Sequence, residues 1–315
     1  PFWMTLITQF YIPKSLRICL DHAEIIIVDT PYLYPILKNM LKTTSKAKIL
    51  NTHNIEYELW KKRTLFSPIV KSIELKSYRT ADQVLFCNST DKLTFSSQIP
   101  DFSNKSYVVP NGVDIDRFVF STSIRKQYRD KLGLADSSRM FLFTGSHYEP
   151  NKEAFSFIKS FAKKFAKELK LLRVTLVVVG TVSNEYINTE HFKVLGKVED
   201  IMPYLWAADF GINPIIIGSV VNIKMIEFLA AKIPILSSPF GCRGLRLIDK
   251  VDCITFHRSN ILEAIHYAIQ LKPYSMKKMA ESAFYKNYSS IDMKIALREI
   301  WQNPSVSEES QFLKC

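Results

Sequence analysis

The segment Ala208–Leu245 reads ADFGINPIIIGSVVNIKMIEFLAAKIPILSSPFGCRGL and contains two short apolar runs, at 210–213 and 233–237. Between them lie a loop around Gly218 and Ser219 and an amphipathic stretch that begins near residue 221. Buried parallel strands are typically short aliphatic runs, and a crossover helix usually connects them. The segment therefore predicts a strand–helix–strand unit of an α/β protein.

The same alternation of short apolar runs and helical-period segments recurs along the chain. Further strands are predicted at 24–28, 48–50, 84–87 and 107–109, and in the second half at 140–144, 174–179, 192–195 and 253–256. Most of these runs end in turn or capping residues, as at Asp29, Asn51 and Gly180. In doubly wound sheets, loops at the carboxyl ends of the strands form the ligand crevice.

Two domains are expected from the length of 315 residues. Charged, strand-poor sequence between 114 and 140 separates the two groups of strands, so the domain connection is placed there. The prediction is a first Rossmann-like domain over 1–125 and a second over 126–285. A helix over 286–301, which can pack back on the first domain, and a tail over 302–315 complete it.

The first half contains fewer predicted strands than the second. Either the first domain is small, or it lacks its opening strand–helix units, roughly 60–80 residues by the usual size of such units. The chain begins at Pro1 rather than at an initiator Met, which favours an incomplete first domain.

Composition narrows the function further. The net charge of +12 favours anionic partners such as phosphorylated small molecules, nucleic acid or an anionic membrane surface. The five cysteines are scattered, which indicates reduced thiols rather than a disulfide framework or a zinc site. No apolar run reaches the ~18 residues of a membrane span, and the first residues lack the pattern of a signal peptide. The expected location is cytoplasmic.

The loop at Gly218 and Ser219 has the physics of an anion site. A loop that leads into a helix offers free N–H groups and the positive end of the helix dipole. Lys224 lies in the first turn of that helix, and Glu227 lies three residues later on the same face. Lys224 would bind a phosphate, and Glu227 would accept hydrogen bonds from sugar hydroxyls. The competing interpretation is an exposed Lys–Glu pair on an amphipathic helix.

This segment resembles the nucleotide-diphosphate site of the family 4 (group 1) retaining glycosyltransferases. Many members read G-[SG]-G-T-R-x-K-x-x-E-x-x-A-x-G-x-P-V-V-x-T-x-x-G-x-x-G-L there. The matching positions in this chain are Gly218, Ser219, Lys224, Glu227, Ala230, Pro234, Gly241, Gly244 and Leu245.

Other segments match the family in the same order along the chain, from about residue 23 to about residue 246. They are NTHNIE at 51–56, ADQVLFCNS at 81–89, VPNGVD at 109–114, FTGS at 143–146 with Pro150, Asn151 and Ala154, and GKVED at 196–200 with Tyr204, Ala208 and Asp209.

The resemblance implies a GT-B α/β fold, in which two Rossmann-like doubly wound domains face a cleft, with the first domain incomplete here. It implies metal-independent, retaining transfer from a UDP- or GDP-sugar to a glycan or lipid-linked acceptor, as in polysaccharide biosynthesis, with no cofactor. The resemblance implies that His53 is catalytic and contacts the donor sugar, and that the loop of Gly145, Ser146 and His147 closes over the phosphates. It implies that Gly218 and Ser219 lie at the anion-binding helix start. It also implies that Lys224 binds the diphosphate and that Glu227 binds the ribose. Glu56 either hydrogen-bonds His53 or caps the helix that begins near Tyr57.

Departures from the family pattern keep alternatives open. Ser219 stands at the first position of the family's Glu-x7-Glu pair, and Val220, Val221 and Asn222 stand where a subgroup has Gly, Thr and Arg. Glycine allows a close backbone approach that β-branched residues restrict. The alternatives are a non-catalytic remnant or nucleotide-sugar-binding subunit of the same fold, and a nucleotide-sugar epimerase.

The segment 153–172 predicts one basic amphipathic helix. Its lysines are Lys159, Lys163, Lys164, Lys167 and Lys170. Such a helix either covers a sheet with a solvated lysine face or lies on an anionic membrane surface, at the inner face of the membrane. The first interpretation is the commoner one. Nucleic acid is not expected as a partner, because the basic residues are dispersed and no nucleic-acid motif is present.

Overall fold

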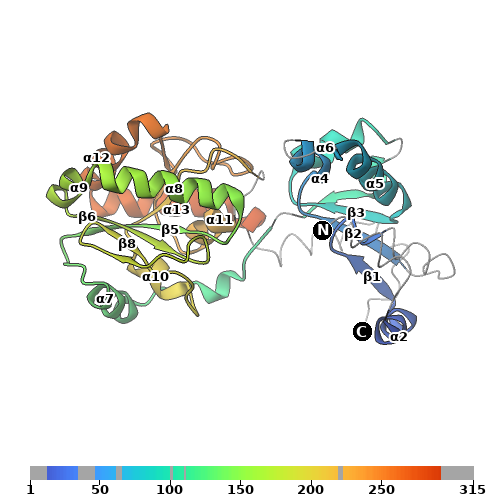
Figure 1. Ribbon diagram of the computed structural model, residues 1–315, viewed down its shortest axis with the longest axis horizontal. Helices are drawn as coiled ribbons and strands as arrows, with labels where there is room; N and C mark the ends of the chain where they lie inside the picture. Colours follow the sequence, from blue (N-terminus) through green and yellow to red (C-terminus); the bar gives the residue numbers. More distant parts are fainter. Residues whose placement is uncertain are drawn as a thin grey trace. The chain divides into compact units, whose positions relative to one another are not determined.

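The computed structural model describes residues 13–34, 47–61, 66–99, 102–109, 111–218 and 223–291. The chain divides into two compact units: residues 1–110 together with 297–315, and residues 111–296. Four positions singled out from the sequence, residues 219–222, lie outside the described residues, and so does everything after Ile291. Figure 1 labels the helices and strands of both units.

The first unit contains a four-stranded parallel sheet. Its strands are β1 (Ile25–Val28), β2 (Ala47–Thr52), β3 (Gln83–Phe86) and β4 (Ser106–Val108), in the order β1-β2-β3-β4. All four lie where the sequence predicts them. The registers pair Val28 with Leu50 and Thr52 with Phe86, so the carboxyl ends of β1, β2 and β3 meet at one edge.

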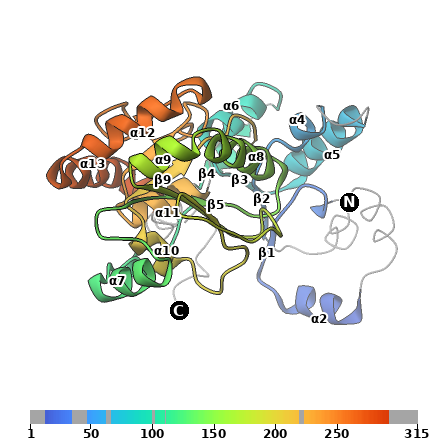
Figure 2. The same ribbon diagram turned by 60° about the vertical axis from the view of Figure 1, so that its left-hand side comes forward.

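The helices of the first unit are α2 (Lys14–His22), α4 (Glu56–Lys61), α5 (Ser67–Thr80) and α6 (Ser89–Ser96), with a 3-10 turn at Phe102–Lys105. Figures 1 and 2 show α4, α5 and α6 together on one side of the sheet, with α2 on the other side of β1. Tyr78, Phe86, Phe95 and Phe102 form an aromatic cluster with ring centroids 4.5–6.1 Å apart. This cluster fixes α5 and α6 on the sheet.

The second unit contains a seven-stranded sheet in the order β11-β10-β9-β5-β6-β8-β7. Its strands are β5 (Arg139–Thr144), β6 (Val174–Val179), β7 (Ile187–Asn188), β8 (Phe192–Val194), β9 (Phe210–Asn213), β10 (Ile235–Ser237) and β11 (Ile254–Thr255). The six predicted strands are confirmed. Strand β7, which runs antiparallel to β8, is too short at two residues to leave a pattern in the sequence.

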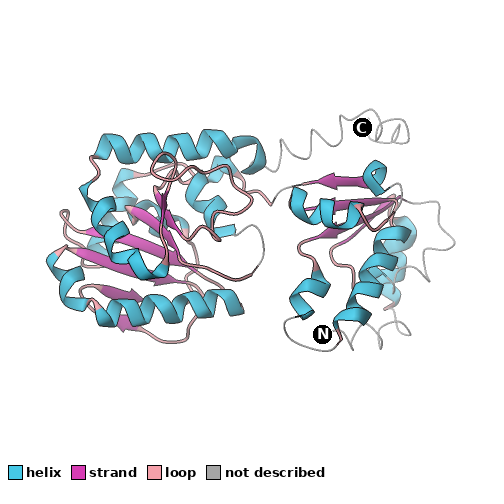
Figure 3. Cartoon of the chain, turned by 90° about the horizontal axis from the view of Figure 1, so that it is seen from above, coloured by secondary structure: helices cyan, strands magenta, loops and turns pink. Residues whose placement is uncertain are grey.

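Helices cover both faces of this sheet (Figures 1 and 3). They are α7 (Thr122–Lys131), α8 (Glu149–Lys164), α9 (Ala166–Leu171), α10 (Met202–Ala207), α11 (Ile223–Ala230), α12 (Ile261–Gln270) and α13 (Pro273–Ile291), with 3-10 turns at Ile115–Arg117 and Arg258–Asn260. One apolar core joins α8, α9 and α12 to the sheet, and a second lies under α10 and α11. This double covering is what a mainly parallel sheet requires.

The prediction of one continuous helix over 153–172 is wrong. It is two helices, α8 and α9, with a break at Phe165, whose φ of −109° and ψ of 30° are not helical. The Phe165 ring instead packs on Phe161, with centroids 5.0 Å apart, at the border of the core. At the C-terminal end, α13 is one helix over residues 273–291.

Buried ion pairs attach α7 to the second unit. The Asp209 carboxylate accepts hydrogen bonds from Arg125 at 2.7 Å, from Arg129 at 3.0 Å and from the Met140 backbone N–H at 2.8 Å. Arg125 also donates to the carbonyl groups of residues 206–208, at the end of α10. The domain boundary predicted at residues 125 and 126 therefore falls inside a helix that is bound to the second unit.

Candidate functional site

The candidate site lies at the carboxyl edge of the second sheet, where β5 leads into α8. The Gly145 N–H donates to the Val179 carbonyl, and the Gly145 carbonyl accepts from the Val182 N–H, both at 3.0 Å. A β-carbon on Gly180 would lie 2.2 Å from that Gly145 carbonyl oxygen, and the φ of Gly180 is +115°. The loops after β5 and β6 therefore touch, and a glycine is required at the contact.

Gly145, Ser146 and His147 form the loop before α8, as the sequence predicts for a site at this edge. The side chains of Ser146 and His147 are exposed. The His147 backbone N–H donates to the Thr181 hydroxyl at 3.1 Å.

Helix α8 begins at Glu149 without a side-chain cap, and the positive end of its dipole lies at this loop. Pro150 has no N–H, and the Asn151 N–H donates to the Tyr148 carbonyl at 2.9 Å. The helix start therefore offers an anion its dipole rather than a row of free N–H groups.

Gly218 lies against this helix start. A β-carbon on Gly218 would lie 2.9 Å from the Pro150 ring, and the φ of Gly218 is +121°. The loop that precedes α11 and the first turn of α8 are therefore in contact, although 68 residues separate them in sequence (218 minus 150). Ser219, which the sequence assigns to the same anion site, lies outside the described residues.

Lys224 is the buried cation of this edge. Its side chain is 7% exposed, and its Nζ donates to Asn151 Oδ1 at 2.7 Å. The same Nζ lies 3.9 Å from the centroid of the Phe143 ring, a cation–π contact. Burial lowers the pKa of Lys224 to about 7, and the charge of Glu227 opposes this shift. The interpretation of an exposed surface pair is therefore wrong for Lys224.

Glu227 lies on α11, one turn after Lys224, and its side chain is half-buried. Burial raises the pKa of Glu227, and the positive charge of Lys224 acts in the opposite direction. The two groups thus influence each other electrostatically on one helix face. Glu227 remains accessible enough to accept hydrogen bonds from a ligand, whereas Lys224 is held in the protein.

Arg258, which the sequence does not single out, fastens the same region. Its guanidinium forms a bidentate pair with Glu153 on α8, with Nη2 2.5 Å from Oε2. The same nitrogen donates to the Pro214 carbonyl at 2.9 Å, just after β9. A bidentate Arg–carboxylate pair fixes orientation as well as distance. The start of α8 and the end of β9 are therefore tied together.

His53 belongs to the first unit, in the loop after β2. Its Nε2 lies 2.9 Å from Asp29 Oδ1, and the Asn51 amide donates to the same oxygen at 2.7 Å. Asp29 thus orients His53. The sequence suggests two roles for Glu56, a hydrogen bond to His53 or a cap of the following helix. The Glu56 carboxylate instead accepts a hydrogen bond from the Tyr32 hydroxyl at 3.1 Å. Asp29 follows β1 and His53 follows β2, and the ends of these two strands meet at one sheet edge. The sequence could have indicated the pairing of Asp29 with His53 through this arrangement.

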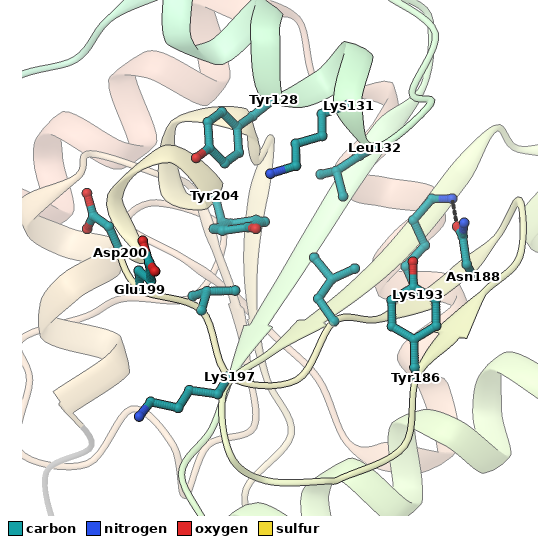
Figure 4. Close-up of a pocket in the computed structure, with 12 residues that line it drawn as sticks. Tyr128, Lys131, Leu132, Tyr186, Asn188, Lys193, Lys197, Glu199, Asp200 and Tyr204 are labelled. Carbon is teal, nitrogen blue, oxygen red and sulfur yellow. Dashed lines mark hydrogen bonds between the residues drawn. The ribbon is translucent and has the colours of Figure 1, made fainter.

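Outside the candidate site, a hollow of about 450 Å³ lies between the end of α7, strands β7 and β8, and the loop 195–200. Figure 4 shows its lysines pointing in different directions. Lys193 donates to Asn188 at 2.6 Å, away from the ammonium groups of Lys131 and Lys197. The positive charges of this hollow therefore do not converge on one point.

Two negative findings apply to the described ranges alone. In them, no three His, Cys, Asp or Glu side chains gather as a metal-ion site would require. Across the same ranges, every helix is too short or too polar to cross a membrane.

Part of the second unit matches a known family. Residues 138–270, which include the candidate anion site, match the family model of glycosyl transferases group 1. The second unit therefore carries the sequence pattern of group 1 glycosyl transferases. No curated protein sequence matches the chain significantly.

Solved structures show the fold of the chain. HepE from Anabaena, solved with UDP and glucose, has a TM-score of 0.72 and 15% identity, and the match covers 91% of this chain and 78% of that one. Sucrose-phosphate synthase from Thermosynechococcus elongatus has a TM-score of 0.71 and 12% identity, and the match covers 95% of this chain and 81% of that one. WaaG, a glycosyltransferase involved in lipopolysaccharide biosynthesis, has a TM-score of 0.63 and 15% identity, and the match covers 86% of this chain and 81% of that one. The chain therefore has the GT-B fold.

Proposed function

We propose that this protein is a glycosyltransferase that moves a sugar from a UDP- or GDP-sugar to a glycan or lipid-linked acceptor. The transfer retains the configuration at the anomeric carbon and uses no metal ion. The similarity to HepE, solved with UDP and glucose and also with UDP-glucose, supports a nucleotide-sugar donor. WaaG, involved in lipopolysaccharide biosynthesis, supports a glycan or glycolipid acceptor.

The observation that carries the proposal is the convergence of three anion-binding features at the carboxyl edge of the second sheet. These are the uncapped start of α8, the Gly218 loop that touches it at Pro150, and the buried ammonium of Lys224. A helix start and a cation together stabilise the negative charge that develops on a leaving diphosphate. Such a site supplies by backbone and lysine the stabilisation that a metal ion supplies elsewhere.

The remaining roles follow from position. Glu227, half-buried one turn along α11, accepts hydrogen bonds from the ribose hydroxyls. Gly145, Ser146 and His147 close over the phosphates. His53, oriented by Asp29 in the first unit, contacts the donor sugar as the catalytic residue. The hydrogen bond between His53 Nε2 and Asp29 Oδ1 fixes the orientation of the imidazole ring for this contact.

Calorimetric titration with UDP, GDP and their sugar conjugates tests the donor site. The variant Lys224→Ala should lose about 1.5–3 kcal/mol of nucleotide affinity, because it removes a hydrogen bond to a charged group. Lys163→Ala, on the exposed side of α8, is the matched control and should bind as the wild type does. Unchanged affinity in Lys224→Ala would refute the assignment. Absence of binding to any nucleotide by the folded protein would favour the non-catalytic alternative.

Membrane association is a separate part of the proposal. Lys163 and Lys167 are exposed on α8 and α9, whereas Lys159 and Lys170 pair with Glu185 and Glu190. The unpaired lysines are the candidate contact with anionic lipid. Cosedimentation with phosphatidylglycerol vesicles, and none with phosphatidylcholine vesicles, is the expected result. Replacement of both lysines by Glu should abolish it, and equal binding to both vesicle types would contradict it.

A further inference from the structure

Asn151 connects the lysine of the candidate donor site to the loop before α8. It lies in the first turn of α8, and its side chain is 8% exposed. Its carbonyl oxygen Oδ1 accepts the hydrogen bond from Lys224 Nζ at 2.7 Å. Its amide nitrogen Nδ2 lies 3.2 Å from both the carbonyl oxygen and the hydroxyl of Ser146. One short side chain therefore joins α11 to the loop 145–148.

Both ends of the amide are needed for this connection. An ammonium group only donates hydrogen bonds, so it needs an acceptor. The carbonyl oxygen of Ser146, which accepts from the Tyr148 N–H at 2.7 Å, takes a second hydrogen bond from the Asn151 amide. Asparagine supplies one of each at a fixed separation. An aspartate would keep the acceptor and lose the donor, and a leucine of similar size would lose both.

The position of Lys224 depends on this acceptor. A lysine side chain has about 2 kcal/mol of rotamer entropy, which ordering must overcome. The Phe143 ring, 3.9 Å from Nζ, attracts the charge without choosing a direction for its N–H bonds. The hydrogen bond to Asn151 supplies that direction and leaves further N–H groups of the ammonium for a ligand.

We propose that Asn151 is a positioning residue of the donor site, which aims the Lys224 ammonium at the diphosphate. This inference rests on the proposed function, because it gives Asn151 a role in binding the same diphosphate. Asn151 acts through Lys224, so the effect of its removal requires Lys224 to be present.

A double-mutant cycle tests this dependence, with UDP and GDP as probes in calorimetric titrations. The variants are Asn151→Leu, Lys224→Met and the double variant. Asn151→Leu alone should weaken the binding of the favoured nucleotide about tenfold, the worth of one hydrogen bond to a charged group. In the Lys224→Met background the same substitution should change affinity less than twofold. Additive losses, or unchanged affinity in Asn151→Leu, would overturn the proposal.

The chain offers a matched control outside the site. Lys193, also 7% exposed, donates to Asn188 Oδ1 at 2.6 Å on β7 and β8. Asn188→Leu breaks the same type of Lys–Asn bond and should leave nucleotide affinity unchanged. If Asn151→Leu does not fold, Asn151→Ser replaces it, since serine is tolerated near helix starts and is too short to reach the ammonium.

The outcomes separate the two proposals. If the wild type binds neither nucleotide, the proposed function fails and this inference fails with it. If the wild type binds and Lys224→Met weakens binding while Asn151→Leu does not, the donor site stands and the role of Asn151 falls. A second readout needs no nucleotide: titration of ¹³Cε-labelled lysine by NMR should show a lower pKa for Lys224 in Asn151→Leu. An unchanged Lys224 titration would contradict the proposal.

Discussion

The Gly145 carbonyl oxygen lies where a side chain on Gly180 would begin, 2.2 Å from the position of its β-carbon. The two glycines end neighbouring parallel strands, β5 and β6, so their contact sets the spacing of the loops at the ligand edge. No rotation of a side chain relieves such a clash, because the opposing atom belongs to the backbone.

Gly180→Ala should therefore destabilise the protein by about 2–5 kcal/mol, the sum of a strained φ and an overpacked contact. Gly133→Ala is the matched control, since Gly133 also has a positive φ of +64° but has no atom within 4 Å of its β-carbon position. It should lose only about 1–2 kcal/mol. Urea denaturation of both variants measures the difference, and equal losses would show that the contact with Gly145 has no cost.

Lys224 should make stability depend on pH. Its pKa is about 7 in the fold and 10.5 ordinarily, so between these values the unfolded chain holds a proton that the folded chain lacks. Stability therefore rises with pH through this window, and the penalty of the buried charge is complete below pH 7. Between pH 7 and 9 the gain of the wild type over Lys224→Met should reach about 2 kcal/mol. Denaturation curves at several pH values measure it, and parallel pH profiles of the two proteins would contradict it.

Glu74 should be a main support of the first unit. This buried carboxylate accepts hydrogen bonds from the backbone N–H groups of Glu56 at 2.7 Å and Tyr57 at 2.9 Å, at the start of α4. Glu74→Ala leaves two N–H groups without their acceptor and should cost about 2–4 kcal/mol. Lys76→Ala, exposed on the same helix, serves as the control. A loss no larger than that of the control in thermal unfolding would refute this role.

Asp209 should be equally important in the second unit. Asp209→Asn removes the negative charge that faces Arg125 and the buried Arg129, and breaking a buried ion pair costs about 3–5 kcal/mol. Asp200→Asn, whose exposed carboxylate accepts from the Met202 N–H at 3.0 Å, is the control and should cost less than about 1 kcal/mol. Guanidinium denaturation compares them. A similar midpoint for the two variants would show that the arginines find other partners.

The strands could be predicted from sequence because each is a β-branched or aromatic run that ends in turn chemistry. Val174–Val179, buried at every position, is the clearest example. The break at Phe165 could not be predicted in this way, since lysine and apolar residues keep their helical spacing through it. At Phe165 the backbone angles leave the helical region, although no glycine or proline marks the position.

The site could be predicted in part. The motif around Lys224 and the loop at Gly145 lie at one sheet edge, as expected for an anion site. The burial of Lys224 could not be foreseen, because its partner Asn151 is 73 residues away and its aromatic neighbour lies on another strand. The position of α7 was hidden for the same reason: Arg125 bonds to Asp209, 84 residues later.

The contacts of Arg258 set an order in which the second unit can fold during synthesis. A ribosome delivers Arg258 105 residues after Glu153 and 44 residues after Pro214, the two groups that it joins. The central strand β5 is made first in its sheet, and the edge strand β11 is made last. A nascent chain can therefore pair its inner strands early, but it fastens the start of α8 to the end of β9 only after Arg258 has been made. Chains released before residue 258 would contain most of the sheet and lack the clamp on its ligand edge.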